Sequence, residues 1–340
     1  MSSPFTVTID WLAFTLPVAT ASETMRALRG DWTKGERGFR GYPVSWMIAG
    51  GGRGIGMLGT GALRAPGEVH VDLSAGIVAS WPQEKMRSVL QWIFSKGGHL
   101  TRIDCALDDR TSSVPLSTIR DAITAGQCVT RADHLQCISS GSIHKGTASG
   151  ETITIGSRTS QTFLRIYDKR LALQGRKQED WEQYGIRWEL ELKKDRAQLC
   201  GKILSHFQEH EWLEILISSF LRPYVEFKDT DREAKDENRC RAPLLDWWER
   251  LTDGLRKAPL VVEKEAQTLE SVKRWVSKSL APMLAVVCVA EPEGQAWLNQ
   301  QLDAGVNRWK DRHRRLLQQR PRNKRRAQEA QPTPSGVKEN

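Results

Sequence analysis

The sequence has neither a long apolar run nor an apolar leader. Its longest uncharged apolar stretch, from Leu280 to Ala290, is eleven residues long and contains a proline, whereas a membrane-spanning helix needs about 20 residues. The N-terminus has no basic residue before Arg26, and Asp10 interrupts its apolar stretch. It therefore lacks the charged start and continuous apolar core of a secretory signal. We expect a cytoplasmic protein without a transmembrane segment.

The cysteine patterns that build disulfide frameworks and zinc modules are also missing. The chain has six cysteines, but none forms a Cys-x-x-Cys pair and none has a histidine nearby at zinc-ligand spacing. We therefore expect reduced thiols in the core. The residues are Cys105, Cys128, Cys137, Cys200, Cys240 and Cys288.

One glycine string has the pattern of a dinucleotide-binding loop but not its context. Gly54, Gly56 and Gly59 fit G-x-G-x-x-G. Such a site needs a helix directly after the glycines, with its N-terminus on the pyrophosphate. Here residues 60–68 contain further Gly and Pro and lead to a strand, so we expect a hairpin or a close backbone approach. The sequence also has no Walker A string, which argues against nucleotide hydrolysis.

Positive charge is concentrated near the C-terminus. The 340 residues are 39% hydrophobic and 27% charged, with a net charge of +9, which is typical of a soluble protein of about two domains. Residues 308–326 hold ten Lys or Arg against one acid, so they carry the whole excess. This tail predicts sequence-independent phosphate contacts that weaken with salt, with a solubilising role as the alternative. Its predicted DNA-binding residues are Arg308, Arg312, Arg314, Arg315, Arg322, Lys324 and Arg325.

The first half of the chain has the pattern of strands with a few helices between them. Short segments rich in β-branched and aromatic residues, bounded by Gly and Pro, predict strands. Apolar residues at helical spacing predict helices over 83–95 and 117–125. The predicted strands are 6–16, 44–48, 69–73, 101–107, 152–157, 162–169 and 186–193, with 152–157 and 162–169 forming a hairpin.

From Asp195 onward the pattern is helical. This order predicts an α+β fold: a largely antiparallel sheet with flanking helices, followed by a mainly helical C-terminal region. We expect three parts, residues 1–195, 196–305 and 306–340, of which the last is basic and disordered after Pro321. The predicted helices are 196–204, 211–221, 244–255, 268–280 and 295–317, with a charged loop at 223–241.

Three strands each combine an apolar face with an ionisable one, because successive side chains in a strand alternate. Solvated outer faces of a sheet are the simplest interpretation of any one of them. The content of the faces favours chemistry instead, since a tyrosine stands between two cations and near several carboxylates. The ionisable faces are Arg165, Tyr167 and Lys169; Arg187, Glu189, Glu191 and Lys193; and Arg102, Asp104 and Asp108.

These residue types suit phosphodiester transesterification by tyrosine. A phenol is a poor nucleophile until cations or a metal stabilise its anion, and Arg165 and Lys169 could hold phosphate oxygens beside Tyr167. Asp104 with Glu189 or Glu191 supplies hard oxygen ligands for Mg²⁺ or Mn²⁺. Glu189 or Glu191 could also take the phenol proton.

Other residues are weaker candidates. His206 and His210 have metal-binding spacing, but no third ligand accompanies them, so a surface or helix-capping role is expected. The thirteen tryptophans, Trp247 and Trp248 among them, are expected mostly in the core, with base stacking as the alternative for one.

Several motifs together resemble the replication initiation factor family. This family includes rolling-circle initiators of staphylococcal-type plasmids, nickases of conjugative elements and phage replication proteins. The resemblance spans roughly residues 9–285, and its motifs occur in the family's order. They are IDWLAF from Ile9, VHVDLSAG from Val69, TRIDCALDD from Thr101, TIGSR from Thr154, RIYDK from Arg165, RWELELK from Arg187, YVEF from Tyr224, Asn238-Arg239 and Trp247-Trp248.

The resemblance implies a relaxase-like DNA nicking domain in residues 1–195, with Tyr167 as the nucleophile. The family cuts one origin strand, keeps the 5′ phosphate on tyrosine, leaves a 3′ hydroxyl as a primer, and later closes the circle. It requires a divalent metal, usually acts as a homodimer and recruits a host superfamily 1 helicase. Residues 196–305 would then serve origin recognition or dimerisation, and further DNA contacts are assigned to Arg158, Arg187, Lys193 and Arg239.

Some alternatives stay open. Tyr184 is a second candidate nucleophile, in a charged connection. The His-hydrophobe-His metal pair of other relaxases is absent; the nearest string contains His70 and Asp72, so His70 is a reserve ligand. A non-catalytic DNA-binding regulator on the same scaffold is the alternative function, and an RNA-binding protein is a third.

Overall fold

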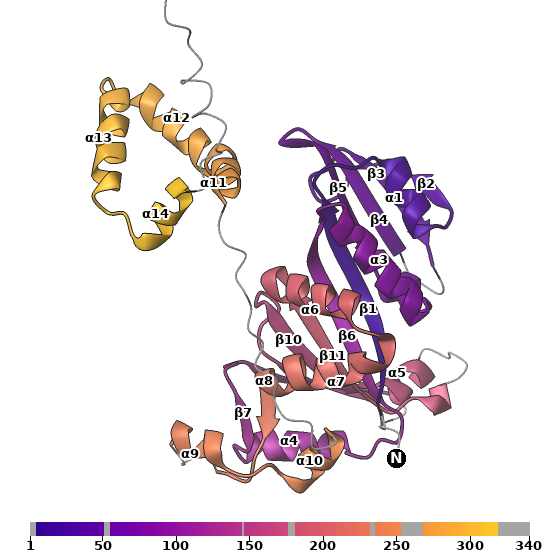
Figure 1. The fold of residues 1–340 in the computed structure, drawn as a ribbon. Helices are drawn as coiled ribbons and strands as arrows, with labels where there is room; N and C mark the ends of the chain where they lie inside the picture. Colours follow the sequence, from indigo (N-terminus) through magenta and orange to yellow (C-terminus); the bar gives the residue numbers. More distant parts are fainter. Residues whose placement is uncertain are drawn as a thin grey trace, which may run out of the picture. The chain divides into compact units, whose positions relative to one another are not determined.

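The structure is a computed structural model. It describes residues 5–50, 55–144, 146–175, 181–231, 235–252 and 268–318. The chain divides into two compact units, one ending at Leu260 and the other starting at Val261 (Figure 1). Within the described ranges, no helix is long and apolar enough to cross a membrane.

The first unit is built on a ten-stranded sheet in which every strand pair is antiparallel. The predicted α+β fold is therefore confirmed. The strand order is β2-β3-β4-β5-β1-β6-β11-β10-β9-β8, which places β6, β11 and β10 side by side. The strands are β1 (Phe5–Leu16), β2 (Trp32–Lys34), β3 (Val44–Ala49), β4 (Ile55–Ala62), β5 (Ala65–Leu73), β6 (His99–Asp109), β8 (Leu135–Ser142), β9 (Thr147–Ile155), β10 (Thr162–Asp168) and β11 (Ile186–Lys193).

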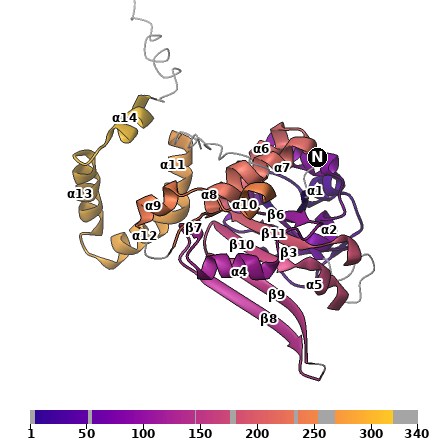
Figure 2. The ribbon, with the colours of Figure 1, turned by 90° about the horizontal axis from the view of Figure 1, so that it is seen from below.

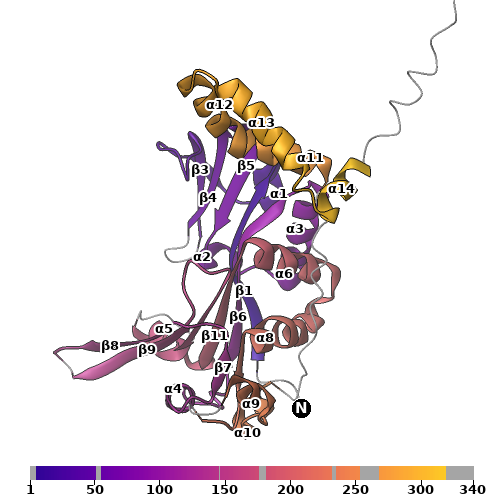
Figure 3. The ribbon, with the colours of Figure 1, turned by 90° about the vertical axis from the view of Figure 1, so that its left-hand side faces the viewer.

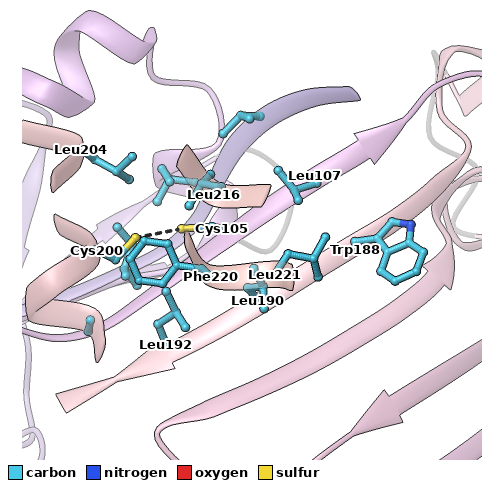
Figure 4. Close-up of a cluster of buried hydrophobic side chains, with 14 of the residues drawn as sticks. Cys105, Leu107, Trp188, Leu190, Leu192, Cys200, Leu204, Leu216, Phe220 and Leu221 are labelled. Atoms are coloured by element: carbon cyan, nitrogen blue, oxygen red, sulfur yellow. Dashed lines mark hydrogen bonds between the residues drawn. The ribbon is translucent and has the colours of Figure 1, made fainter. Parts of the chain in front are cut away.

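One face of the sheet is apolar and is covered by helices. α3 (Gln83–Ser95), α6 (Lys194–His206) and α7 (Trp212–Leu216), with its π-helical continuation Ile217–Leu221, pack against it. Burying each large apolar side chain stabilises the fold by about 1.5–3 kcal/mol. The packed helices therefore hold the strands in place through the apolar face of the sheet. Figure 4 shows Cys105, Leu107, Trp188, Leu190 and Leu192 of the sheet meeting Cys200, Leu204, Leu216, Phe220 and Leu221 of the helices.

The other short elements complete the first unit (Figures 1 and 2). α4 packs on β9 and β10, and β7 pairs with β12 in a separate two-stranded sheet. The elements are α1 (Ala21–Leu28), α2 (Ala75–Val78), α4 (Leu116–Thr124), β7 (Cys128–Thr130), α5 (Lys169–Gly175), α8 (Arg222–Tyr224), β12 (Val225–Phe227), α9 (Asp236–Arg241) and α10 (Asp246–Leu251).

The described part of the glycine string lies in a strand. Its described glycines, Gly56 and Gly59, lie in β4. A Cβ on Gly59 would lie 2.8 Å from the Tyr42 Cβ, so glycine lets the Tyr42 ring pack directly on the strand. β4 also pairs antiparallel with β3 before it and β5 after it, so the described part of the string belongs to β-hairpins, and both the predicted hairpin and the close backbone approach are confirmed.

Two predicted elements differ in detail. The charged loop at 223–241 contains β12 and α9, because Glu226 is neutralised by Arg222 and Lys228 while Val225 and Phe227 are buried. The prediction of a loop from charge alone is therefore wrong.

Two cysteines, Cys137 and Cys240, are exposed rather than in the core, and all six are free.

The described part of the second unit consists of helices. They are α11 (Leu269–Trp275), its π-helical continuation Val276–Leu280, α12 (Ala281–Ala290), α13 (Gly294–Val306) and α14 (Asp311–Gln318). The prediction of a single helix over 295–317 is wrong, since α13 ends at Val306 and α14 begins at Asp311. There the Lys310 amide donates to the His313 ring nitrogen, which starts a new helix.

Candidate active site

Antiparallel register places the three predicted ionisable faces in contiguous rows. Asp104 of β6 is opposite Glu191 of β11, and Glu189 of β11 is opposite Arg165 of β10. Arg187 lies between Asp108 and Tyr167. Paired residues share a face of the sheet, so these residues lie opposite the apolar layer. The structure thus brings the sequence-predicted residues of all three strands together.

This ionisable face is buried. Only 1% of Asp104, 4% of Glu191 and 4% of Arg187 is exposed, so the interpretation as solvated outer faces is wrong for β6 and β11, while Arg165, Tyr167 and Lys169 of the third strand are partly exposed. A charge removed from water needs a partner and hydrogen bonds. The partners are provided by the neighbouring rows, in two groups.

In the first group, two arginines bridge three carboxylates. Arg102 donates to Asp104 at 2.5 and 2.8 Å and to Glu191 at 2.9 Å. Arg165 donates to Glu189 at 2.5 Å and lies 3.5 Å from both Asp104 and Glu191. About a fifth of each arginine side chain is exposed, 23% and 22%. The arginines therefore lie between the carboxylates and solvent.

In the second group, one buried arginine joins three strands. Arg187 donates to both oxygens of Asp108, at 2.6 and 2.5 Å, and also to Asp10 of β1. Asp10 reaches it from a β-bulge, where the pairing of β1 with β6 shifts between Ile9 and Trp11. The Arg187 guanidinium is thus fixed on the row that also contains Tyr167.

The phenol of Tyr167 is free of hydrogen bonds to the described residues. Within the described residues, its hydroxyl makes no hydrogen bond, whereas the Tyr42 hydroxyl donates to Glu68 at 2.6 Å and that of Tyr224 donates to the Ile155 carbonyl at 3.0 Å. Burial raises the pKa of Tyr167, and Arg187 opposes this rise. A neutral phenol beside a fixed cation can become a nucleophile once its proton is removed.

Two groups with pKa values near neutrality belong to the same face as this phenol. Burial raises the pKa of Glu189 to about 7, with Arg165 acting in the opposite direction. Burial, with the Arg187 charge, lowers the pKa of Lys169 to about 8, although its Nζ is 3.4 Å from Asp108. A base near 7 and an acid near 8 are suited to proton transfer at physiological pH.

The second candidate nucleophile is also near. The Lys169 Nζ lies 3.7 Å from the centroid of the Tyr184 ring, which places Tyr184 at the end of the same face. Sequence alone did not predict this proximity, because the connection that holds Tyr184 is not a strand.

The carboxylates have the chemistry of a metal site but not its arrangement. Asp104, Glu189 and Glu191 supply the oxygens that Mg²⁺ and Mn²⁺ prefer, and burial raises the pKa of Asp104. Arg102 and Arg165 donate hydrogen bonds to these carboxylate oxygens. Within the described ranges, no group of three Asp, Glu, His or Cys residues is arranged to hold a metal ion. This arrangement does not fit a metal while both arginines stay in place.

Most other predicted residues lie outside the cluster. Lys193 pairs with Glu191 and donates to the Arg158 carbonyl, and Arg158 is exposed. Arg239 donates to the Gly126 and Cys128 carbonyls, which ties α9 to β7. His70, on β5, bonds Thr15 two strands from β6. Of the tail, Arg308, Arg314 and Arg315 are exposed and Arg312 lies in α14, while Arg322, Lys324 and Arg325 lie outside the described residues.

Two residues of the site were not predicted to be functional from the sequence. Asp10 pairs with Arg187, and the Trp11 ring lies 4.4 Å from the Arg102 guanidinium carbon. The available signal was Asp10 itself, which continues the polar alternation of Thr6 and Thr8 in an otherwise apolar strand. The bulge that turns it toward Arg187 has no signal in a single sequence.

Known proteins show similarities to this chain. A family model described as replication initiation factor matches residues 98–302. A Bacillus subtilis (strain 168) protein, provisionally named as the DNA relaxase NicK, is 26% identical over 205 residues, which are 58% of this chain and 54% of that protein. The chain thus spans about half the length of this curated relative. The structure of a rolling circle replication initiator protein from Geobacillus stearothermophilus is similar in fold, with a TM-score of 0.60 and 19% identity over 75% of this chain and 98% of that one.

Proposed function

The chain belongs to the replication initiation factor family, and we propose on this premise that it is a rolling-circle replication initiator that nicks and rejoins one strand of origin DNA through Tyr167. The observation that carries the proposal is a phenol without a hydrogen-bond partner among the described residues, beside a fixed arginine and groups that titrate near neutrality. No comparable arrangement surrounds Tyr42 or Tyr224, whose hydroxyls are hydrogen-bonded.

The proposed reaction is a transesterification. The Tyr167 oxygen attacks the phosphorus and forms a phosphotyrosine bond, while the bond from phosphorus to the 3′ oxygen breaks. Glu189 takes the phenol proton, since diagonal neighbours on paired strands are within reach of long side chains, and the Lys169 ammonium gives a proton to the leaving 3′ oxygen. Arg165 neutralises charge on the phosphoryl oxygens. The product is a 5′ phosphotyrosine with a free 3′ hydroxyl, and the reverse reaction closes the strand.

The reaction is tested with negatively supercoiled DNA of the protein's own replicon and Mg²⁺ or Mn²⁺. We expect nicked circles and a protein–DNA adduct that resists denaturant. Tight origin binding without any adduct would instead indicate a non-catalytic regulator, and preference for RNA would contradict both.

We predict a bell-shaped pH dependence of single-turnover nicking of a single-stranded oligonucleotide. Glu189 acts only when deprotonated, so the rate rises as pH passes about 7. Lys169 acts only when protonated, so the rate falls above about 8. Glu189→Gln should lower the rate by about 10²- to 10⁴-fold and remove the acidic limb. A wild-type rate that is constant from about pH 6 to 9 would contradict both roles.

We propose that Mg²⁺ or Mn²⁺ is held by Asp104 with Glu191, in competition with Arg102 and Arg165. Glu189, the third predicted ligand, is the proton acceptor and would hold the ion only in place of that role. When bound, such an ion would polarise the scissile phosphate. Competition predicts that Asp104→Ala abolishes Mn²⁺ binding, while Arg102→Gln tightens it by roughly tenfold. Titration calorimetry or Mn²⁺ paramagnetic resonance on the DNA-free protein measures both. Unchanged Mn²⁺ binding by Asp104→Ala would remove this residue from the site.

Sequence-independent DNA contacts are proposed for the C-terminal tail. Truncation after Asn307 should weaken binding to origin and unrelated DNA about equally, and should flatten the salt dependence of both. Fluorescence anisotropy at several salt concentrations tests this, and a selective loss of origin binding would contradict it. We also propose phosphate contacts for Arg158 and Lys193. We propose that Arg239 and the helical region serve origin recognition. From the family resemblance, we also propose that the protein forms a homodimer and recruits a host superfamily 1 helicase.

A further inference from the structure

A two-stranded ribbon leaves the sheet beside Tyr167. β10 pairs with β9 only from Leu164 opposite Ile155 to Tyr167 opposite Thr152. Past that point β8 and β9 pair with each other alone, and Figure 3 shows them projecting from the sheet. An isolated hairpin is marginally stable in water and gains from a partner.

The strand register extends the sheet face that contains Tyr167, called the active face below, onto this ribbon. Thr152 of β9 is opposite both Tyr167 of β10 and Ile138 of β8. Paired residues share a face, so Gln136, Ile138 and Ser140 of β8 lie on the side of the nucleophile. At about 4.8 Å per strand, Ile138 is roughly 10 Å from Tyr167. This equals about three stacked nucleotides at 3.4 Å each.

The exposed surface on this side of the ribbon differs from the rest of the site. Asp108, Glu189 and Asp104 crowd the region beyond Tyr167 toward β6, whereas no carboxylate lies among the β8 residues of the active face. The acid of the ribbon, Glu151, is opposite Ser139 and therefore on the other face, where it pairs with Arg120 of α4 at 2.5 Å. DNA can therefore approach Tyr167 over the ribbon without facing carboxylates.

The two faces of the ribbon have different surroundings. On the far face, Ile153 and Ile155 of β9 are buried and α4 packs on β9, whereas Leu135, Cys137 and Ser139 of β8 are exposed. On the near face, 42% of Ile138 is exposed, and Gln136 and Ser140 are exposed as well. The near face thus offers an apolar side chain and neutral hydrogen-bonding groups.

We propose that the active-site face of the β8–β9 ribbon, formed by Gln136, Ile138, Ser140 and Thr152, binds the single-stranded DNA next to the scissile phosphate. Ile138 contacts base surfaces, and the hydroxyl and amide groups hydrogen-bond to the strand. Single-stranded DNA fits better than a duplex, because unpaired bases expose faces that an apolar side chain can contact, and none of these four residues is a cation that would hold a duplex backbone. The inference rests on the proposed function, since it assigns the strand that Tyr167 attacks.

Two neighbouring serines provide a matched test. Ser140 is on the active face and Ser139 on the opposite one, and both are exposed, so Ser140→Asp and Ser139→Asp add the same charge to opposite faces. The probe is a fluorescein-labelled single-stranded oligonucleotide that spans the replicon's nick site. We expect Ser140→Asp to raise its Kd by about tenfold through repulsion of phosphates, and Ser139→Asp to stay within about twofold of wild type. Ile138→Ala should raise the Kd by a few-fold.

The binding assay is made in the Tyr167→Phe background, so it reports on the ribbon whether or not the protein nicks DNA. Equal effects of the two aspartates, or no effect of either, would overturn the proposal, as would a loss of duplex binding alone. Thermal melting confirms that the variants fold. If wild-type protein forms no adduct but Ser140→Asp still weakens strand binding selectively, the nicking function fails and the ribbon assignment stands.

Discussion

Replacing Tyr167 by phenylalanine is expected to abolish both nicking and the covalent protein–DNA adduct. The rate should fall by about 10⁴-fold or more, because the substitution removes the oxygen that attacks the phosphorus. The free energy of unfolding should stay near the wild-type value, since the hydroxyl has no hydrogen-bond partner among the described residues. Nicking of supercoiled DNA and gel analysis after denaturation measure the effect.

Tyr184→Phe is the matched control for this substitution. It removes the other phenol of the same face, 3.7 Å from Lys169 measured to its ring centroid, and should leave the adduct in place. An adduct that persists in Tyr167→Phe and disappears in Tyr184→Phe would move the nucleophile to Tyr184.

The second large effect is expected from Arg187→Met. This change leaves Asp10 and Asp108 buried without their shared cation, and only 7% and 2% of these residues is exposed. Breaking a buried ion pair by removing one partner costs about 3–5 kcal/mol. It also removes the cation that opposes the rise in the Tyr167 pKa. We therefore expect a large loss of stability in urea denaturation together with a loss of nicking.

A second variant separates the two effects. Arg187→Lys keeps the charge but cannot bond both carboxylates with a planar fork, so it should recover part of the stability and part of the nicking rate. Wild-type stability of Arg187→Met would contradict the role of Arg187 as the cation that joins β1, β6 and β11.

The sequence predicted the parts of the site but not their assembly. Alternation along each strand correctly placed Arg165 with Tyr167, and Glu189 with Glu191, on ionisable faces. It could not show that β11 lies between β6 and β10, because pairing depends on contacts distant in sequence. Burial of Asp104 and Glu191 also depends on this order, since Arg102 of β6 bonds Glu191 of β11 and Arg165 of β10 approaches both carboxylates.

Predictions failed where local composition and tertiary contacts disagree. The segment 223–241 has the charge of a loop, yet Phe227 is buried and its strand pairs with β7. Asp10 joins the site through its ion pair with Arg187, a contact between residues distant in sequence that one sequence does not reveal. The exposed β8 was missed because its three serines and one glycine resemble a loop, although it extends the active face.

The central claim is that Tyr167 becomes covalently joined to DNA, and mapping the adduct tests it most directly. Wild-type protein is reacted with an oligonucleotide that contains the nick site, digested with nuclease and protease, and analysed by mass spectrometry. We predict a nucleotide joined through its 5′ phosphate to the peptide that contains Tyr167. In a control reaction with an oligonucleotide that lacks the nick site, the same peptide should be unmodified. A nucleotide on any other residue, or a nick without a covalent adduct, would contradict the account.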